Sequence, residues 1–422
     1  MRCVPISALV LLLAMPVAAQ DPPTSATPAP ANDGWRVRWD GHPAIDWPGV
    51  LHVEFHARLQ GDGRASEAAI ERRDDDGFDV GRRRIGIEGR LGRHVEFQVE
   101  RDLEATNPWR DVWINYRPVR AAQIQAGQFK LPFGLEETTG GGSLDFIHRS
   151  LISTRLAPGR DRGLMLHGRV AGRRLGYEVG VFAHDGDHAR PNGGRRVFGD
   201  RTIAGRVTAE PFGRSKAWWS DLHLGTAFTT SALPEGFPAI RGRSLLGVPF
   251  FNSDLWVEGR RERTGLEARW RPGPLSFSTE FIRVADDRRA QSMSGTDLTP
   301  FVARGWYASG TWVVLGARRV ARAAVPRRPL FRGGVGSVQL VGRVERFSLG
   351  GATGPDAPSA SPRASAIAGN GEHAATLGAI WHPNRWIAIH GNLVRETIGE
   401  ANRDAYPRLR FWSRLIRVQV EI

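Results

Sequence analysis

Hydrophobic and polar residues alternate strictly over several stretches of the chain. The first stretch reads Leu51-His52-Val53-Glu54-Phe55-His56-Ala57-Arg58-Leu59. Because successive side chains of a β-strand point to opposite faces, this pattern predicts a strand with one apolar and one polar face. The same period returns within residues 95–100, 203–208, 266–270 and 416–422, and no long helical period competes with it. The fold class is therefore predicted to be all-β.

Clusters of Gly, Pro and charged residues divide the chain into sixteen strand candidates. They begin near residues 50, 81, 94, 111, 123, 163, 175, 201, 219, 263, 275, 305, 336, 373, 386 and 410. Short links near 91–93, 118–122, 171–174, 272–274 and 382–385 alternate with long ones near 60–80, 130–162, 184–200, 230–262, 285–304, 349–372 and 396–409. This layout predicts a transmembrane antiparallel β-barrel with short periplasmic turns and long extracellular loops. The stretch 317–335 is an exception, because it is long where a short link is due.

A soluble β-sandwich is the alternative architecture for such a pattern. Its apolar faces would close on a second sheet, and it would not need regularly alternating short and long links. Tryptophans near predicted strand ends favour the membrane barrel, because aromatic residues form girdles at the membrane interfaces. These are Trp109, Trp113, Trp218, Trp219, Trp270, Trp306, Trp381, Trp386 and Trp412.

The N-terminal segment predicts export. Met1 and Arg2 precede an apolar run that ends in the small residues Val17-Ala18-Ala19, which is typical of a signal peptide of residues 1–19. Residues 20–49 begin with a Pro- and Ala-rich stretch and are interpreted as a periplasmic lead-in, and residues 50–422 as the barrel. No later stretch is long and apolar enough for a transmembrane helix. The single cysteine, Cys3, would be removed with the signal peptide, so no disulfide is expected.

The charge of the chain points to an anionic partner. The formal net charge is +14, or +13 once Arg2 is removed, and Lys130 and Lys216 are the only lysines. A coding bias towards Arg, Ala, Gly and Pro is the alternative explanation. Nucleic acid is a poor partner for an exported chain, which leaves phosphate-like solutes or lipid head groups.

The alternation also predicts which charges face the lumen, because a charged side chain facing hydrocarbon is costly. The inward arginines and glutamates are equal in number, so the wall alone does not make an anion filter, and a lumen of this width is expected to hold water. The inward set is His52, Glu54, His56, Arg58, Arg84, Glu88, Glu96, Glu100, Arg117, His167, Arg169, Glu178, Arg206, Glu267, Arg269, Glu280 and Arg343.

Two loop segments supply the positive excess. Residues 148–163 contain Arg149, Arg155, Arg160 and Arg162 against one acid, Asp161. Residues 317–335 contain six arginines and no acid. Guanidinium forks suit phosphate and carboxylate oxygens, so these segments are candidate anion sites; solvated basic loops are the alternative.

The central part of the chain resembles the phosphate-selective porins O and P. The resemblance rests on Gly127-Gln128-Phe129-Lys130-Leu131-Pro132-Phe133-Gly134-Leu135-Glu136-Glu137, followed by Asp145-Phe146-Ile147, Arg149, Ala157-Pro158-Gly159-Arg160 and Gly163. The later segments Leu266-Glu267-Ala268, Gly273-Pro274, Gly305-Trp306-Tyr307, Arg327-Arg328-Pro329 and Leu377-Gly378 keep the spacing of the family. The similarity covers roughly residues 50 to 422.

This resemblance implies a trimer of sixteen-stranded barrels whose third long loop folds inward as a constriction. Lys130 and arginines 149, 155, 160 and 162 would then lie in or beside that loop. Two features depart from the family: a constriction rich in lysine is impossible with two lysines, and Ile422 replaces the usual terminal aromatic residue. A general anion preference is therefore expected rather than strict phosphate selectivity.

The sequence contains no motif for enzymatic chemistry. No nucleophile elbow, P-loop, zincin helix or paired-cysteine site is visible, so neither an enzyme nor a cofactor is expected. His52 and His56 are about 13 Å apart along a strand, too far to share a metal ion. The cluster His184-Asp185-Gly186-Asp187-His188 is interpreted as a polar external loop rather than a metal site.

The sequence therefore predicts an outer-membrane porin for passive diffusion of small anions, with phosphate or polyphosphate as candidates. The expected partners are outer-membrane lipid, small anions and two further copies in a homotrimer. A general porin of low selectivity and a non-conducting structural or adhesive barrel are the alternatives. The candidate pore-lining residues are Lys130, Arg149, Arg155, Arg160, Arg162, Arg58, Arg84, Arg169, Arg206, Arg269 and Arg343.

Overall fold

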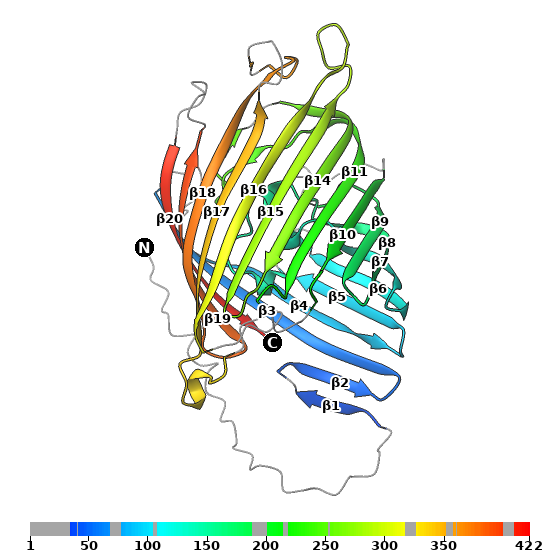
Figure 1. The fold of residues 1–422 in the computed structure, drawn as a ribbon, viewed down its shortest axis with the longest axis vertical. Helices are drawn as coiled ribbons and strands as arrows, with labels where there is room; N and C mark the ends of the chain where they lie inside the picture. Colours follow the sequence, from blue (N-terminus) through cyan, green and yellow to red (C-terminus); the bar gives the residue numbers. More distant parts are fainter. Residues whose placement is uncertain are drawn as a thin grey trace, which may run out of the picture.

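Sixteen strands in the described part of the chain form one closed antiparallel barrel (Figure 1). The computed structural model describes residues 34–39, 41–67, 77–103, 108–187, 201–213, 218–251, 254–316, 326–351, 358–359, 361–399 and 409–422. The barrel strands are β3 (Leu51–Ser66), β4 (Gly77–Leu91), β5 (Val95–Asp102), β6 (Trp109–Val119), β7 (Ala122–Lys130), β8 (Arg160–Val170), β9 (Leu175–Phe182), β10 (Thr202–Ala209), β11 (Leu222–Pro238), β14 (Trp256–Trp270), β15 (Leu275–Arg288), β16 (Leu298–Leu315), β17 (Ser337–Gly351), β18 (Ile367–His382), β19 (Ile387–Ile398) and β20 (Leu409–Glu421). Each pairs with the next in chain order, and β20 pairs with β3 to close the ring.

The outward face of the barrel is apolar, as contact with lipid requires. In β20, Trp412, Ile416 and Val418 are exposed, while Phe411 and Leu415 on the other face are buried. Exposed leucine and valine side chains recur at every second position of β8 and β9 as well. Among the described residues, no helix is long and apolar enough to cross a membrane. The predicted fold class is confirmed.

The strands extend further than the sequence pattern indicated. The link between β3 and β4 spans residues 67–76 rather than 60–80, and β14 begins at Trp256 rather than near residue 263. Gly61 and Gly63 on the outward face of β3, and charged residues on both faces of β14, obscure the period in these extensions. Backbone hydrogen bonds continue there because they need no apolar side chain.

Residues 34–49 are more ordered than expected. Strands β1 (Arg36–Trp39) and β2 (Pro43–Trp47) form a hairpin below the barrel, and β2 pairs with the first residues of β3. Closing a barrel requires neighbouring strands to be staggered. The residues of β3 before Arg58 therefore do not pair with β20, whose pairing with β3 begins at Arg58. The hairpin therefore covers an exposed strand edge. The sequence pattern predicted an ordered start near Val50 and did not predict this hairpin.

Loops fill a large part of the barrel interior. Residues 131–159, between β7 and β8, contain the short helices α1 (Leu135–Thr138), η2 (Gly141–Ser143) and α2 (Leu151–Arg155). Residues 239–255 contain the hairpin of β12 (Gly242–Arg243) and β13 (Pro249–Phe251). Apolar side chains of both loops form one buried cluster with inward residues of β14–β20. The prediction of a lumen lined by polar groups and filled by water is wrong for this half of the barrel.

Candidate pore and its constriction

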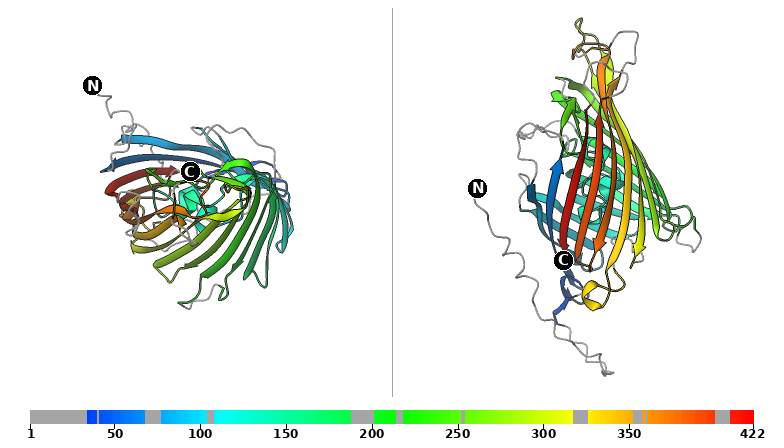
Figure 2. Two further views of the ribbon diagram at one scale, coloured as in Figure 1. Left: turned by 90° about the horizontal axis from the view of Figure 1, so that it is seen from above. Right: turned by 90° about the vertical axis from the view of Figure 1, so that its left-hand side faces the viewer.

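The loop of residues 131–159 crosses the lumen (Figure 2). Its glycine-rich tip, residues 140–142, reaches the opposite wall, where the amide of Gln419 donates to the carbonyl oxygen of Gly142 at 3.1 Å. A Cβ on Gly142 would lie 2.1 Å from a carboxylate oxygen of Glu421 and 2.7 Å from Nε of Arg58. Glycine thus allows the backbone to pass close to β3 and β20, and the loop narrows the lumen at this point.

Two buried carboxylates of the wall hold the helices of this loop. Glu280 accepts the backbone N–H groups of Leu135 and Glu136 at 2.6 and 2.9 Å, at the start of α1. Glu345 accepts the N–H of Leu151 at 2.6 Å, at the start of α2. These bonds satisfy helix donors that have no partner within the helix. The wall therefore determines the position of the loop.

Lys130 and Arg149 stabilise the fold of the same loop. The Lys130 ammonium group donates to the carbonyl oxygen of Thr139 at 2.9 Å, and Arg149 donates to the same oxygen at 2.7 Å. Both side chains also lie beside Glu137, with Nε of Arg149 at 3.6 Å. Part of their hydrogen-bonding capacity is thus used to close the constriction loop.

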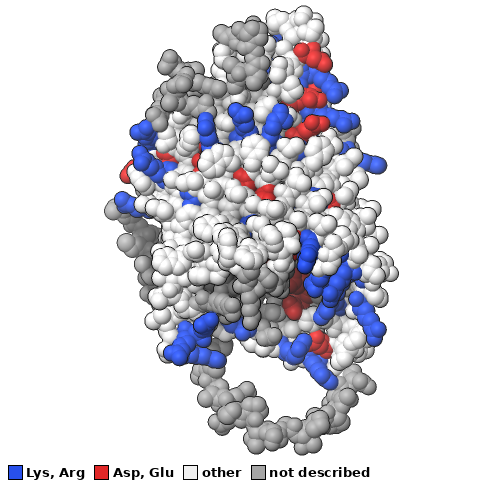
Figure 3. Space-filling view, viewed as in Figure 1, with Lys and Arg blue, Asp and Glu red and all other residues white. Residues whose placement is uncertain are grey.

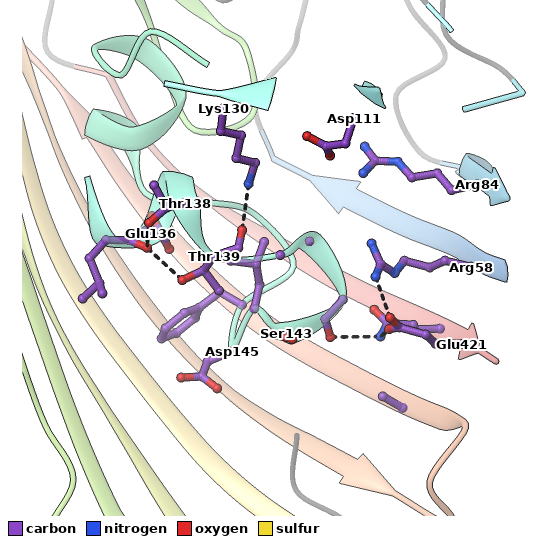
Figure 4. A pocket seen from close by; sticks show the side chains of 18 of the residues that line it. Arg58, Arg84, Asp111, Lys130, Glu136, Thr138, Thr139, Ser143, Asp145 and Glu421 are labelled. Atoms are coloured by element: carbon purple, nitrogen blue, oxygen red, sulfur yellow. Dashed lines mark hydrogen bonds and ion pairs between the residues drawn. The ribbon is translucent and has the colours of Figure 1, made fainter. Parts of the chain in front are cut away.

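A cavity of about 840 Å³ is lined by this loop, by residues of β3–β9 and by residues of β14–β20. Figure 4 shows Arg58, Arg84 and Asp111 on the wall side of this cavity, and Thr138, Thr139 and Ser143 on the side of the loop. The lining contains seven basic residues and seven acidic ones. These are Arg58, Arg84, Lys130, Arg160, Arg269, Arg271 and Arg385, and Glu88, Glu100, Asp111, Glu136, Asp145, Glu178 and Glu421. The cavity is polar and charged, but the two signs balance.

The arginines on the wall of this cavity are paired with acids. Arg58 contacts Glu421 at 2.5 Å, across the seam that closes the barrel. Arg84 contacts Glu100 at 3.1 Å and Asp102 at 2.9 Å. Arg160 and Asp111 form a further pair at 2.7 Å. Such pairs fix the guanidinium groups in place and leave alternating charges along the wall.

A smaller cavity of about 310 Å³ shares lining residues with the first. Arg169, Arg206 and Arg269 line it. Arg206 is buried and lies 2.5 Å from Glu267 and 3.2 Å from Glu178, whereas Arg169 is exposed and lies 3.3 Å from Glu210. The wall charges here again alternate in sign.

Comparison with protein families now identifies the chain. The family model described as phosphate-selective porin O and P matches residues 53–420. The chain belongs to the phosphate-selective porin O and P family. No match is found among the curated proteins.

Solved porin structures share the fold of this porin at low sequence identity. An anion-selective porin from Comamonas acidovorans is 13% identical, with a TM-score of 0.51, covering 88% of this chain and 100% of that one. The outer membrane channel DcaP of Acinetobacter baumannii is 10% identical, with a TM-score of 0.55, covering 89% and 98%. OmpT of Vibrio cholerae in its trimer form is 11% identical, with a TM-score of 0.53, covering 88% and 100%. These structures support the barrel architecture.

The structure brings together seven of the residues predicted to line the pore. Lys130, Arg58, Arg84, Arg160, Arg169, Arg206 and Arg269 line the two cavities, with Arg269 shared between them and Arg206 held in buried ion pairs. Whether they bind anions remains a prediction.

Arg162, Arg155 and Arg343 are placed differently from the prediction. Arg162 is exposed and lies on the same outward face of β8 as Leu164 and Leu166. Arg155 donates to the carbonyl oxygens of Arg243 and Ser244 at 3.2 and 2.8 Å, so it joins the two loops inside the porin. Arg343 is buried beneath the constriction loop. The pattern of charges did not separate these roles from pore lining.

The predicted polar loop after β9 is in part a buried ion cluster. Asp185 lies between Arg261 and Arg263, with its carboxylate 3.1 Å from Nη1 of Arg261 and 2.7 Å from Nη2 of Arg263. Burial alone would raise the pKa of Asp185, but the guanidinium groups of Arg263 and Arg261 lower it below its ordinary value. His188 lies outside the described residues. Within those residues, no cluster of three or more His, Cys, Asp or Glu is placed to hold a metal ion.

The short-turn end of the porin carries an exposed basic rim. Arg93, Arg120, Arg173 and Arg174 lie in its short turns, and Arg327, Arg328 and Arg332 lie in the described part of the link before β17. The other three arginines of the predicted 317–335 segment lie outside the described residues. This rim supplies a positive charge that the balanced cavity lacks.

Two acids that complete the cavity were not singled out from the sequence. Asp111 pairs with Arg160, and Glu421 pairs with Arg58. The alternation of β20 does place Glu421 on the face of Arg417 and Gln419. Its pairing with Arg58, however, depends on the register between β20 and β3, and the pattern of a single strand does not predict that register.

Proposed function

We propose that this outer-membrane porin allows passive diffusion of small anions through the main cavity beside the constriction loop. The observation that carries this proposal is the convergence of Arg58, Arg84, Lys130 and Arg160, from four strands, on one cavity. Guanidinium groups offer paired donors that match the oxygens of phosphate and carboxylate. Phosphate-sized anions are therefore the proposed solutes.

The anion preference is proposed to be modest. Equal numbers of basic and acidic residues line the main cavity, so an anion entering it meets both signs. The basic rim at the short-turn end raises the local anion concentration at that mouth, as clustered charge does at low ionic strength. A general porin of low selectivity is the second candidate, and the balanced lining favours it.

The comparisons support the direction of this preference. The matching family is described as phosphate-selective, and one neighbour in fold is an anion-selective porin. A homotrimer is also proposed, since a neighbour is described in a trimer form. Removal of residues 1–19 on export is proposed as well; N-terminal sequencing of the protein from outer membranes tests it.

Reversal potentials in planar bilayers test the proposal. In a KCl gradient the wild type is expected to favour chloride over potassium, and added phosphate is expected to lower the chloride current. Arg84→Gln with Arg160→Gln leaves Glu100, Asp102 and Asp111 uncompensated at the cavity. The preference is then expected to shift towards potassium.

The double variant Arg327→Gln with Arg328→Gln is the matched control. It removes the same charge from the exposed rim, where salt screens it more strongly, so a smaller shift is expected. Equal shifts for the two variants would contradict a route past Arg84 and Arg160. A cation-selective wild type would contradict the anion preference, and a purified trimer without conductance would favour a structural barrel.

A further inference from the structure

A row of basic side chains crosses the outward face of six neighbouring strands. One member lies on each strand from β15 to β20, and each alternates with outward apolar or small residues. The row consists of Arg283, Arg304, Arg346, His373, Arg395 and Arg414, and is called the arginine belt below. All six side chains are exposed. Figure 3 shows basic side chains in a row across the upper part of this face.

The register places the arginine belt at one height on the barrel. Arg283 faces Arg304, and Arg346 faces His373, as direct partners. At the other three strand pairs, the belt residue of the second strand lies two positions closer to the short turns than the residue directly opposite the belt residue of the first. The total offset is thus about 20 Å along the strands at 3.3 Å per residue. Strands tilted by about 40° and spaced about 4.8 Å apart need the same offset over five steps to keep a constant height.

The arginine belt marks the edge of the apolar band on the long-loop side. The next outward residue towards the short turns is apolar on all six strands. These residues are Phe281, Trp306, Val344, Ala375, Leu393 and Ile416. Charged side chains are destabilising in the hydrocarbon and tolerated at its interface, so the belt lies at the level of the lipid head groups.

Acidic partners are scarce on this face. Among the described outward positions of β15–β20 there is one acid, Asp287, which lies beyond the belt near the end of β15. Asp287 already contacts Arg289 at 3.2 Å. The guanidinium group of Arg395 lies 5.5 Å from the ring centre of Trp412, an arrangement that holds it at the surface. The described outward positions of β15–β20 therefore do not balance the charge of Arg283, Arg304, Arg395 and Arg414.

We propose that the arginine belt binds the phosphate groups of anionic lipid head groups in the leaflet on the long-loop side. Arginine forks form paired hydrogen bonds with phosphate, and a row of them spans about 31 Å along the membrane plane, because five strand spacings of about 4.8 Å are crossed at a tilt of about 40°. Head groups that carry phosphate, such as those of phosphorylated glycolipids, match this row in charge and in height. The belt would tie the porin laterally to its own leaflet, separately from the solute path inside.

Native mass spectrometry of the full porin in detergent tests the proposal. The probes are a bisphosphorylated glycolipid and the same lipid without its phosphates. The belt variant carries R283Q, R304Q, R395Q and R414Q. The matched control carries R93Q, R120Q, R173Q and R174Q, which removes four exposed arginines from the short turns. Unheated gel migration and Trp fluorescence verify that each variant is folded.

The wild type and the control are expected to retain the bisphosphorylated lipid, and the belt variant to retain it at least about tenfold less. A third variant with lysine at the four belt positions is expected to recover much of the binding. Equal retention of the two lipids, or unchanged retention by the belt variant, would overturn the proposal. Displacement of the lipid by phosphate but not by chloride at equal ionic strength would assign the belt to free phosphate instead. If the belt variant loses the trimer and the wild type binds no lipid, the face is a contact between subunits. That result would also overturn the proposal.

Discussion

Arg343 gives the sharpest test of the constriction, because its proposed role there is anchoring rather than lining. Its guanidinium group is buried between Glu345, at 2.9 Å, and Glu136, at 3.2 Å. It also donates to the carbonyl oxygen of His148 at 3.1 Å and lies 4.5 Å from the ring centre of Phe146. Three of these partners belong to the constriction loop. Arg343→Gln would therefore weaken the attachment of the loop to β17.

The expected cost follows from these contacts. Breaking a buried ion pair from one side costs about 3–5 kcal/mol, since the remaining carboxylates stay buried without a counter-charge. The lost contact with Phe146 adds about 1 kcal/mol, and glutamine recovers about 1 kcal/mol through a single hydrogen bond. The expected loss of unfolding free energy is thus about 3–5 kcal/mol. The freed loop should also make the single-channel current noisier.

Urea unfolding in lipid vesicles, followed by tryptophan fluorescence, measures this loss. Adding Glu345→Gln to Arg343→Gln should cost less than the sum of the two single changes, by about 2 kcal/mol, because the partners contact each other. Arg169→Gln is the control, since its half-exposed pair with Glu210 contributes at most about 1 kcal/mol. A loss below about 1 kcal/mol in Arg343→Gln, together with altered ion selectivity, would mean that Arg343 lines the pore and that the anchoring argument is wrong.

Three further changes test other parts of the structure. Asp185→Asn leaves the buried Arg263 without its counter-charge and should cost about 3 kcal/mol. Because the pKa of Asp185 is held below 3.8, urea titrations should give a constant difference from the wild type above about pH 5, which shrinks as the pH falls below about 4. Gly142→Leu places a side chain against Glu421 and Arg58 and should lower single-channel conductance at least about twofold. Deletion of residues 34–49 uncovers the start of β3 and should lower unfolding free energy in urea by about 2–4 kcal/mol, from four lost pairing positions.

The barrel could be predicted because its signal is local. An outward side chain must suit lipid at every second position, so a stretch such as 51–59 reveals both its strand and its phase. The alternation of short and long links then gives the strand count without any tertiary information. Even the constriction loop followed from the resemblance of the segment around Lys130 to a known family. These features are encoded by neighbouring residues.

The filling of the lumen could not be predicted in the same way. Ile282, Phe347 and Val394 point inward and are buried against the loops, yet in sequence they look like any apolar strand residue. A strand that is apolar on both faces shows no period at all. The partners of these residues lie in residues 239–255 and 131–159, far away along the chain. Only the closed register shows where those loops meet the wall.

The charges of the lumen illustrate why counting them says little about selectivity. A loop that folds into the barrel brings helix ends and backbone donors, and the wall meets these donors with carboxylates such as Glu280 and Glu345. A buried carboxylate in turn needs a cation close by or a proton, and Arg343 supplies the cation for Glu345. Each anchor of this kind adds one acid and one base to the count while offering neither to a solute. Selectivity must therefore arise from the charges that remain in contact with the cavity and its mouths, such as Arg58, Arg84 and the basic rim.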